Sequence, residues 1–131
     1  TMFALVSGAR RCVKVIDSEL GQKSLAGTVI ILDQNQLVEH GINQSVIEQY
    51  GANSSETVKL LASKAKGFFN SDIGISITGD ESNIVNIGFE INEKSYAINR
   101  KYPGDKSRVL LRASTESFLN LDRLLRENYD L

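Results

Sequence analysis

The sequence predicts a single α/β domain: a mixed five-stranded sheet in a three-layer α/β/α arrangement. The first observation is residues 73–79 (Ile-Gly-Ile-Ser-Ile-Thr-Gly), where β-branched and small side chains alternate with the period of a strand, directly after a turn cluster at 70–72. The second is the order of segments with strand-like and helix-like patterns, which reads β-α-β-(short helices)-α-β-β-β-α. Right-handed crossovers then put strand 73–79 at the centre of the sheet.

The length and charge of the chain exclude several classes of protein. A chain of 131 residues corresponds to one domain, here 1–131 without an inter-domain linker. Fifteen basic and sixteen acidic residues give a net charge of -1, which favours neither nucleic acid nor a membrane as partner. No apolar run approaches the roughly 20 residues that span a bilayer, and no signal peptide is visible. With a single Cys, these features predict a cytoplasmic protein.

The first third of the chain predicts two buried strands joined by a helix. Residues 2–6 form a short apolar run, Ser7-Gly8 is expected to turn the chain, and Ser7 is expected to cap a helix that ends at Gly21. Residues 25–32 are almost continuously apolar, which is typical of a strand buried on both faces of a parallel sheet. The apolar face of the first helix is formed by Ala9, Cys12 or Val13, Ile16 and Leu20.

The middle of the chain predicts two short helices and one longer helix. One short helix is expected to start at Asp33-Gln34-Asn35 and run through Glu39, and the other covers residues 44–50. The longer helix has two candidate N-caps: Asn53, which forms a capping-box pattern with Glu56, and Ser54. Its core-facing residues are Val58, Leu61, Ala62, Ala65 and Phe68 or Phe69.

The last third predicts two strands and a long helix. Strand 84–91 is expected to be antiparallel to the rest of the sheet, because a tight turn at 92–93 joins it to strand 94–102. The Pro103-Gly104-Asp105 turn leads into a helix at 106–128. The residues that face the core from these elements are Val85, Ile87, Phe89 and Ile91 on the strand and Leu110, Ala113, Ser117, Leu121 and Leu124 on the helix, with Val109, Phe118 and Leu125 broadening its apolar stripe.

A ligand site is expected at Thr78-Gly79. In open α/β sheets, ligands bind beyond the carboxyl ends of the strands, and Gly79 permits the backbone conformations that a turn needs there.

From Gly41 onward the chain resembles the CinA C-terminal domain family, whose active members are nicotinamide-mononucleotide amidohydrolases. The residues that carry the resemblance are Gly41-Ile42, Glu48, Gly51, Ala52, Ser54, Glu56, the segment from Asp72 to Gly79, and the turn Tyr102-Pro103-Gly104-Asp105 with the helix after it. The resemblance implies strand order 2-1-3-4-5 with strand 4 antiparallel. It also implies that a leading helix of the family is missing before residue 1.

The family's catalytic residues are not matched in this sequence. The family uses a serine nucleophile supported by a tyrosine and a lysine. The serine position aligns with Ala4, or with Leu5 if one gap is introduced, while the tyrosine becomes Ile31 and the lysine Gln36. A Gly-rich loop after Thr-Gly is replaced by the shorter segment 80–83, and the arginine after Pro-Gly-Asp is Lys106.

We therefore interpret the chain as a non-catalytic CinA-like domain, a pseudoenzyme with a structural or interaction role. One alternative is an amidohydrolase acting on nicotinamide mononucleotide or a related small amide, with Ser7 as nucleophile. The second is nucleotide binding without turnover, through Ser7, Gly8, Thr78, Gly79 and Lys106. No cofactor or metal is expected. The broad apolar stripe of the last helix predicts a homo-oligomer or a partner protein.

Other chemically suggestive residues have structural readings that we favour. Ser63-x-x-Lys66 is expected to lie on a solvated helix face, Cys12 to be a packed thiol, and His40 to end a helix. The acidic pair Asp80-Glu81 is expected to be a solvated turn.

Overall fold

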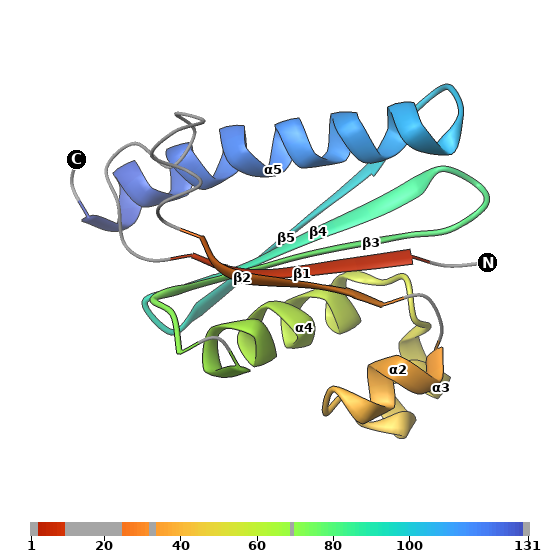
Figure 1. The fold of residues 1–131 in the computed structure, drawn as a ribbon, viewed down its shortest axis with the longest axis horizontal. Coiled ribbons are helices and arrows are strands. Elements are labelled where there is room, and N and C mark those ends of the chain that lie inside the picture. Colours follow the sequence, from red (N-terminus) through yellow and green to blue (C-terminus); the bar gives the residue numbers. More distant parts are fainter. Residues whose placement is uncertain (1–2, 10–24, 32–33, 69, 130–131) are drawn as a thin grey trace.

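A computed structural model of the chain describes residues 3–9, 25–31, 34–68 and 70–129. One five-stranded sheet, with the strand order β2-β1-β3-β4-β5, is covered by α5 on one face and by α4 on the other (Figure 1). The α/β class is therefore confirmed. The elements in chain order are β1 (Phe3–Ala9), β2 (Leu25–Ile31), α2 (Gln34–Glu39), α3 (Gln44–Tyr50), α4 (Ser55–Phe68), β3 (Ile73–Gly79), β4 (Ile84–Ile91), β5 (Lys94–Lys101) and α5 (Lys106–Tyr129).

The expected strand directions are wrong for β1. Every neighbouring pair in the described sheet is antiparallel, whereas the sequence predicted that only strand 84–91 would run against the others. Ser7 and Gly8, predicted as a turn, instead continue the strand to Ala9 and pair with both β2 and β3. Ladder partners on both edges outweigh the low strand propensity of Ser and Gly. Ser7 is therefore not the N-cap of a helix, and the rest of the predicted first helix lies outside the described residues.

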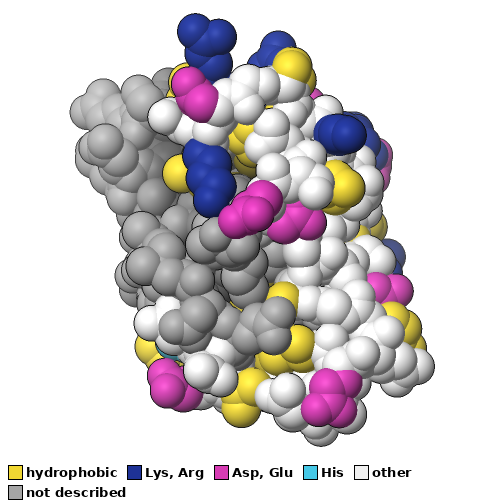
Figure 2. Space-filling model, turned by 90° about the vertical axis from the view of Figure 1, so that its right-hand side faces the viewer, with side chains coloured by type: hydrophobic (Ala, Val, Ile, Leu, Met, Phe, Trp, Pro, Cys, Tyr) yellow, Lys and Arg dark blue, Asp and Glu magenta, His cyan; other side chains and the backbone are white. Residues whose placement is uncertain are grey.

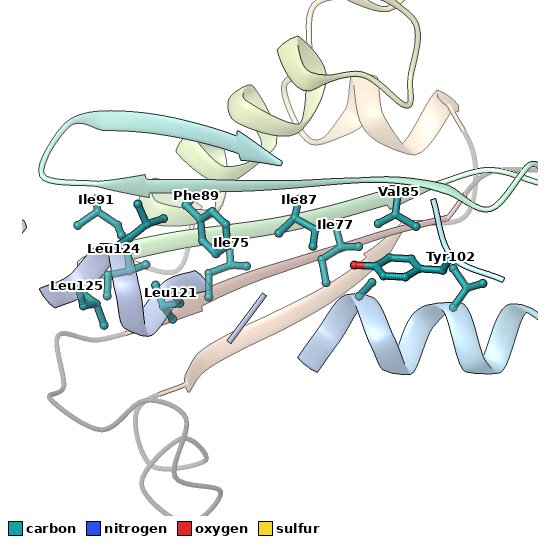
Figure 3. Packing of buried hydrophobic residues seen from close by; sticks show 13 residues of the cluster. Ile75, Ile77, Val85, Ile87, Phe89, Ile91, Tyr102, Leu121, Leu124 and Leu125 are labelled. Atoms are coloured by element: carbon teal, nitrogen blue, oxygen red, sulfur yellow. The ribbon is translucent and has the colours of Figure 1, made fainter. Parts of the chain in front are cut away.

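The main core lies between the sheet and α5 (Figure 3). The predicted inward face of β4 is confirmed, since Val85, Ile87, Phe89 and Ile91 are fully buried. On α5 the prediction needs one correction, because Leu110 is 41% exposed and Val109 takes the buried position. The other core residues of this layer are Ile73, Ile75, Ile77, Tyr102, Ala113, Leu121, Leu124 and Leu125.

The opposite face of the sheet is built from small residues that let α4 approach closely. A Cβ atom on Gly74 would overlap the carbonyl oxygen of Ala62, and one on Gly88 would overlap that of Val58. Between these glycines the Ser76 hydroxyl donates a hydrogen bond to the same Val58 carbonyl. A second core cluster forms behind α4 from Leu37, Ile42, Ile47, Ala52, Leu61 and Ala65.

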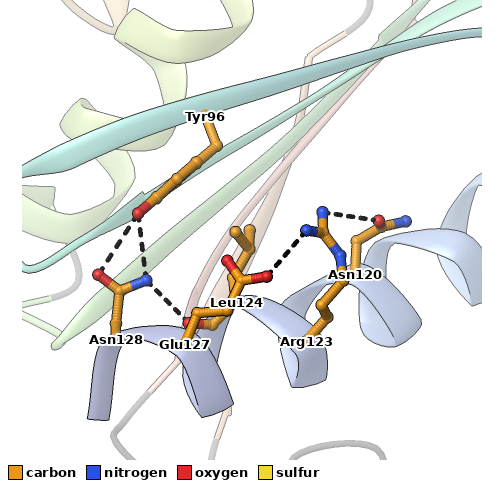
Figure 4. A network of polar contacts seen from close by, with 6 residues as sticks. All are labelled: Tyr96, Asn120, Arg123, Leu124, Glu127 and Asn128. Carbon is orange, nitrogen blue, oxygen red and sulfur yellow. Dashed lines mark hydrogen bonds and ion pairs between the residues drawn. The ribbon is translucent and has the colours of Figure 1, made fainter. Parts of the chain in front are cut away.

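Polar contacts join the C-terminal half of α5 to the sheet (Figure 4). The Asn128 amide donates to the Tyr96 hydroxyl at 3.1 Å and to the Leu124 carbonyl at 2.8 Å. Arg123 forms an ion pair with Glu127 one turn later, at 3.2 Å. The Tyr96–Asn128 contact fixes the end of α5 against β5.

Candidate functional site

The Thr78-Gly79 end of β3 is buried and occupied by the protein's own side chains. Thr78 has no exposed surface, and its hydroxyl donates a 2.8 Å hydrogen bond to Oδ1 of Asn53. Asn53 lies just before α4 and reaches this position because Ser54, not Asn53, caps the helix: Ser54 Oγ accepts the Thr57 N–H at 3.2 Å. The competing N-cap is thus the correct one, which leaves the Asn53 side chain available to the sheet.

Asn53 is the centre of a connected set of hydrogen bonds. Its Oδ1 atom also accepts from the Asn86 amide at 3.0 Å, while its own amide donates to Asp80 at 3.0 Å and to the Ile84 carbonyl at 2.8 Å. Asn99 extends the chain of bonds by donating to Asn86 at 3.0 Å. We call the side chains of Asn53, Thr78, Asp80, Asn86 and Asn99 the Asn53 network. A ligand that hydrogen-bonded to the Thr78 hydroxyl would have to displace Asn53.

The strand register brings two of the family-aligned positions into the Thr78 row. Ala4 is the cross-strand partner of both Ile31 and Thr78, and Thr78 is in turn opposite Asn86. The positions aligned with the family's serine and tyrosine are therefore neighbours of Thr78 along the sheet. If the gap is introduced, Leu5 falls in the next row, opposite Ile77. Gln36, aligned with the lysine, lies in α2 and is half-buried.

Ser7 and Gly8 are not brought together with Thr78 and Gly79. Ser7 is opposite Ile75 and Gly8 is opposite Gly74. Ser7 is three residues along β1 from the partner of Thr78, a separation of about 10 Å at roughly 3.4 Å per residue. The five predicted ligand-binding residues therefore do not form one site.

The Pro103-Gly104-Asp105 turn has a structural role in the described chain. Gly104 has a φ of +108°, and its carbonyl accepts a hydrogen bond from Asn83 at 2.9 Å. Asp105 Oδ1 accepts the Arg108 N–H at 3.0 Å and so caps α5. Lys106 is the exposed first residue of that helix.

Tyr102 lies directly before this turn. Among the titratable side chains that the structure describes, it has a clear pKa shift. It is 6% exposed, and its hydroxyl has no hydrogen-bond partner among the described residues. Burial is the main cause that raises the pKa of Tyr102 far above its ordinary value, and the Glu116 carboxylate raises it further; Arg100 and Arg112 act in the opposite sense. At neutral pH the phenol is therefore uncharged.

The other candidate residues do not assemble into a catalytic or metal site in the described chain. His40 follows α2 and its Nδ1 lies 2.7 Å from the Gln36 carbonyl, consistent with the predicted place at a helix end. Within the described ranges, no group of three or more His, Cys, Asp or Glu side chains has a metal-binding arrangement. No helix among the same residues has the length and apolar character to cross a membrane. Cys12 lies outside the described residues.

Sequence reasoning missed the Asn53 network, although one signal was available. Asn86 is a polar residue within β4, on the face opposite Val85 and Ile87. Asn is disfavoured in strands, so a central Asn implies a buried polar partner. The sequence alone does not identify that partner as Asn53, which is 33 residues away.

Comparison with known proteins gives consistent matches. The sequence profile described as the CinA C-terminal domain matches residues 26–125. The chain is 32% identical over 98 residues to a CinA-like protein of Petrotoga mobilis, covering 67% of this chain and 24% of that protein. It is 30% identical over 111 residues to a putative competence-damage inducible protein of Thermoanaerobacter pseudethanolicus, covering 76% and 27%. The chain thus spans about a quarter of the length of these curated relatives.

Solved structures give the same fold at lower sequence identity. A competence or damage-inducible protein from Enterobacter asburiae superposes with a TM-score of 0.69 at 20% identity, over 72% of this chain and 67% of that one. A competence-damaged protein (CinA) superfamily protein from Escherichia coli gives 0.59 at 23% identity, over 72% and 60%. At these identities the likeness concerns the fold alone.

Proposed function

Because the chain belongs to the CinA C-terminal domain family, we propose that it is a non-catalytic member whose role is structural or is to bind another protein. The proposal rests on the row of cross-strand partners Ile31, Ala4 and Thr78, in which the positions of the serine and the tyrosine are aliphatic. The Thr78 hydroxyl in this row is already hydrogen-bonded to Asn53. An aliphatic side chain can neither attack an amide nor accept a proton. Because the groups of such a site act as a unit, the loss of nucleophile and tyrosine together removes the mechanism.

An ammonia-release assay with nicotinamide mononucleotide tests this proposal. We expect purified protein to release no more ammonia than a buffer blank, while an active amidohydrolase of the family, assayed in parallel, does. Turnover that survives further purification would contradict the proposal. A Ser7→Ala variant then identifies the source, because loss of turnover in that variant would establish the alternative of a hydrolase that uses Ser7.

Nucleotide binding without turnover is the second alternative. Two observations argue against it at the predicted residues: Thr78 is buried against Asn53, and the register separates Ser7 from Thr78. Titration calorimetry with nicotinamide mononucleotide on an Asn53→Ala variant and on the unmodified protein tests it. Binding that is stronger in the variant would favour a masked ligand site over a purely structural network.

The interaction role is proposed to use the outer face of α5. Leu111 and Leu119 are 68% and 57% exposed and are eight residues apart, so they lie on one face of the helix. We expect light scattering to detect self-association at high concentration, and a Leu119→Gln variant to weaken it. Leu60→Gln, at an exposed leucine of α4, is the matched control and should have no effect. A protein that stays strictly monomeric at high concentration would contradict the proposal of self-association.

A further inference from the structure

Two adjoining grooves lie between the end of β5 and the first turns of α5. They have volumes of about 440 and 450 Å³ and share Pro103, Leu111 and Arg112, so we treat them as one surface, the basic groove. Its volume falls within the range of small-molecule sites. The remaining lining residues are Arg100, Lys101, Tyr102, Gly104, Arg108, Thr115 and Glu116.

The basic groove concentrates positive charge in a chain whose overall net charge is -1. Four cationic side chains line it, and Glu116 is the one carboxylate among its lining residues. Glu116 forms an ion pair with Arg100 at 3.3 Å. Among the described residues, neither Arg108 nor Arg112 forms an ion pair. Figure 2 looks at this end of the molecule; most of the Lys and Arg side chains in view lie in its upper half, with acidic side chains among them.

The position of these cations is unfavourable in the protein alone. Arg108 and Arg112 are four residues apart on α5, so two like charges are neighbours on the helix surface. Arg108 lies in the first turn of α5, where the positive end of the helix dipole disfavours cations and the carboxylate of the capping residue Asp105 offsets part of that effect. By contrast, Arg123 and Arg126 further along the same helix each pair with a carboxylate one turn away. An anion held between Arg108 and Arg112 would remove the repulsion.

The groove also offers contacts for the rest of a ligand. Leu111, between the two arginines, is 68% exposed and forms an apolar wall. Tyr102 also lines the groove, but its hydroxyl is buried in the core between the sheet and α5 (Figure 3) and does not face a ligand there.

We propose that the basic groove binds a small phosphate-bearing molecule, with the phosphate held by the guanidinium groups of Arg108 and Arg112. Guanidinium groups bind phosphate oxygens in a bidentate manner, which a lysine cannot reproduce. The site lies on the α5 side of the sheet and uses no member of the Asn53 network. It therefore does not depend on whether the chain hydrolyses an amide.

Titration calorimetry at low ionic strength tests the proposal with three probes: inorganic phosphate, adenosine 5′-monophosphate and adenosine. We expect saturable binding of both phosphate-bearing probes and none of adenosine. Tighter binding of the monophosphate would indicate an organic phosphate as ligand, and equal binding would indicate free phosphate; both support the site. An Arg108→Gln/Arg112→Gln double variant should bind at least tenfold more weakly, while Arg123→Gln/Arg126→Gln should bind like the unmodified protein.

Three outcomes would overturn the proposal. They are the absence of saturable phosphate binding, an equal loss of binding in the two double variants, and binding of duplex DNA in preference to the small probes. An Arg108→Lys/Arg112→Lys variant keeps the charge but lacks the forked donors, and it should bind with intermediate affinity. This variant keeps the test decisive if the glutamine variant folds poorly.

Discussion

The Thr78 hydroxyl and the Asn53 side chain are joined by a 2.8 Å hydrogen bond that links the end of the central strand to the segment before α4. Asn53 Oδ1 accepts a second hydrogen bond from Asn86, and its amide has two acceptors of its own. Thr78 and Asn86 are both buried. One side chain thus satisfies polar groups that would otherwise be buried without partners, which makes it important for stability.

An Asn53→Ala variant should be destabilised by about 2–4 kcal/mol, because it leaves the Thr78 hydroxyl and the Asn86 amide without their acceptor. Urea unfolding followed by circular dichroism measures the change. Asn120→Ala is the control, since Asn120 bonds only within α5, and alanine favours the helix. If both variants lost the same small amount of stability, the Asn53 network would not be a stabilising unit.

The sequence predicted best those elements whose local pattern matches their final environment. One face of strand β4 meets α5, and its residues alternate between apolar and other side chains. The core-facing residues were therefore predictable from the sequence; they are Val85, Ile87, Phe89 and Ile91. Strand β1 was predicted to end near Val6, because Ser7-Gly8 has the composition of a turn. Its continuation depends on partners supplied by β2 and β3, and such long-range pairing is not encoded in the local pattern.

The candidate site was predictable in part. The alignment identified Ala4 and Ile31 as positions to compare with Thr78, and the register puts them in one row. The hydrogen bond between Asn53 and Thr78 was not predictable from the sequence. Asn53 and Ser54 are both good N-caps, and only the packed structure shows that Ser54 caps α4 and leaves Asn53 to bond to the sheet. The basic groove was not predicted either. Its cations come from two separate segments, β5 and α5, and the sequence pattern alone does not show that they share one surface.

Gly74→Ala should destabilise the protein by about 1–3 kcal/mol or more, because the new methyl group would overlap the Ala62 carbonyl of α4 and force the helix away from the sheet. Gly67→Ala is the matched control. Gly67 lies in α4, where an added Cβ meets nothing within 4 Å, so this change should stabilise the protein by about 0.4–1 kcal/mol. Thermal unfolding of the two variants measures both effects. Equal melting temperatures would contradict the close packing of α4 on β3.

Asp105→Ala should reduce stability by about 1 kcal/mol, because the Arg108 N–H loses its acceptor at the start of α5. Asp105→Asn retains a side-chain oxygen at the same position and should recover most of the loss. Denaturant unfolding of the two variants separates the contribution of the cap from that of the charge. A loss of stability in the asparagine variant equal to that of the alanine variant would assign the effect to charge instead of capping.

Tyr102 should make the folded protein sensitive to alkaline pH. Its pKa in the folded state is raised by burial and by Glu116, so it lies above the value of about 10 expected in the unfolded chain. The stability linked to this group is therefore fully present below that pH and is lost as the pH rises further, because the unfolded chain releases the proton first.

A Tyr102→Phe variant should match the unmodified protein near neutrality, since the hydroxyl has no partner among the described residues, and should lose less stability above pH ~10. Unfolding free energies measured across this pH range test the prediction. Tyr50→Phe, at an exposed tyrosine, is the control. If the Tyr102→Phe and Tyr50→Phe variants had the same alkaline dependence, another group would be responsible, because only Tyr102 of the two is buried beside a carboxylate.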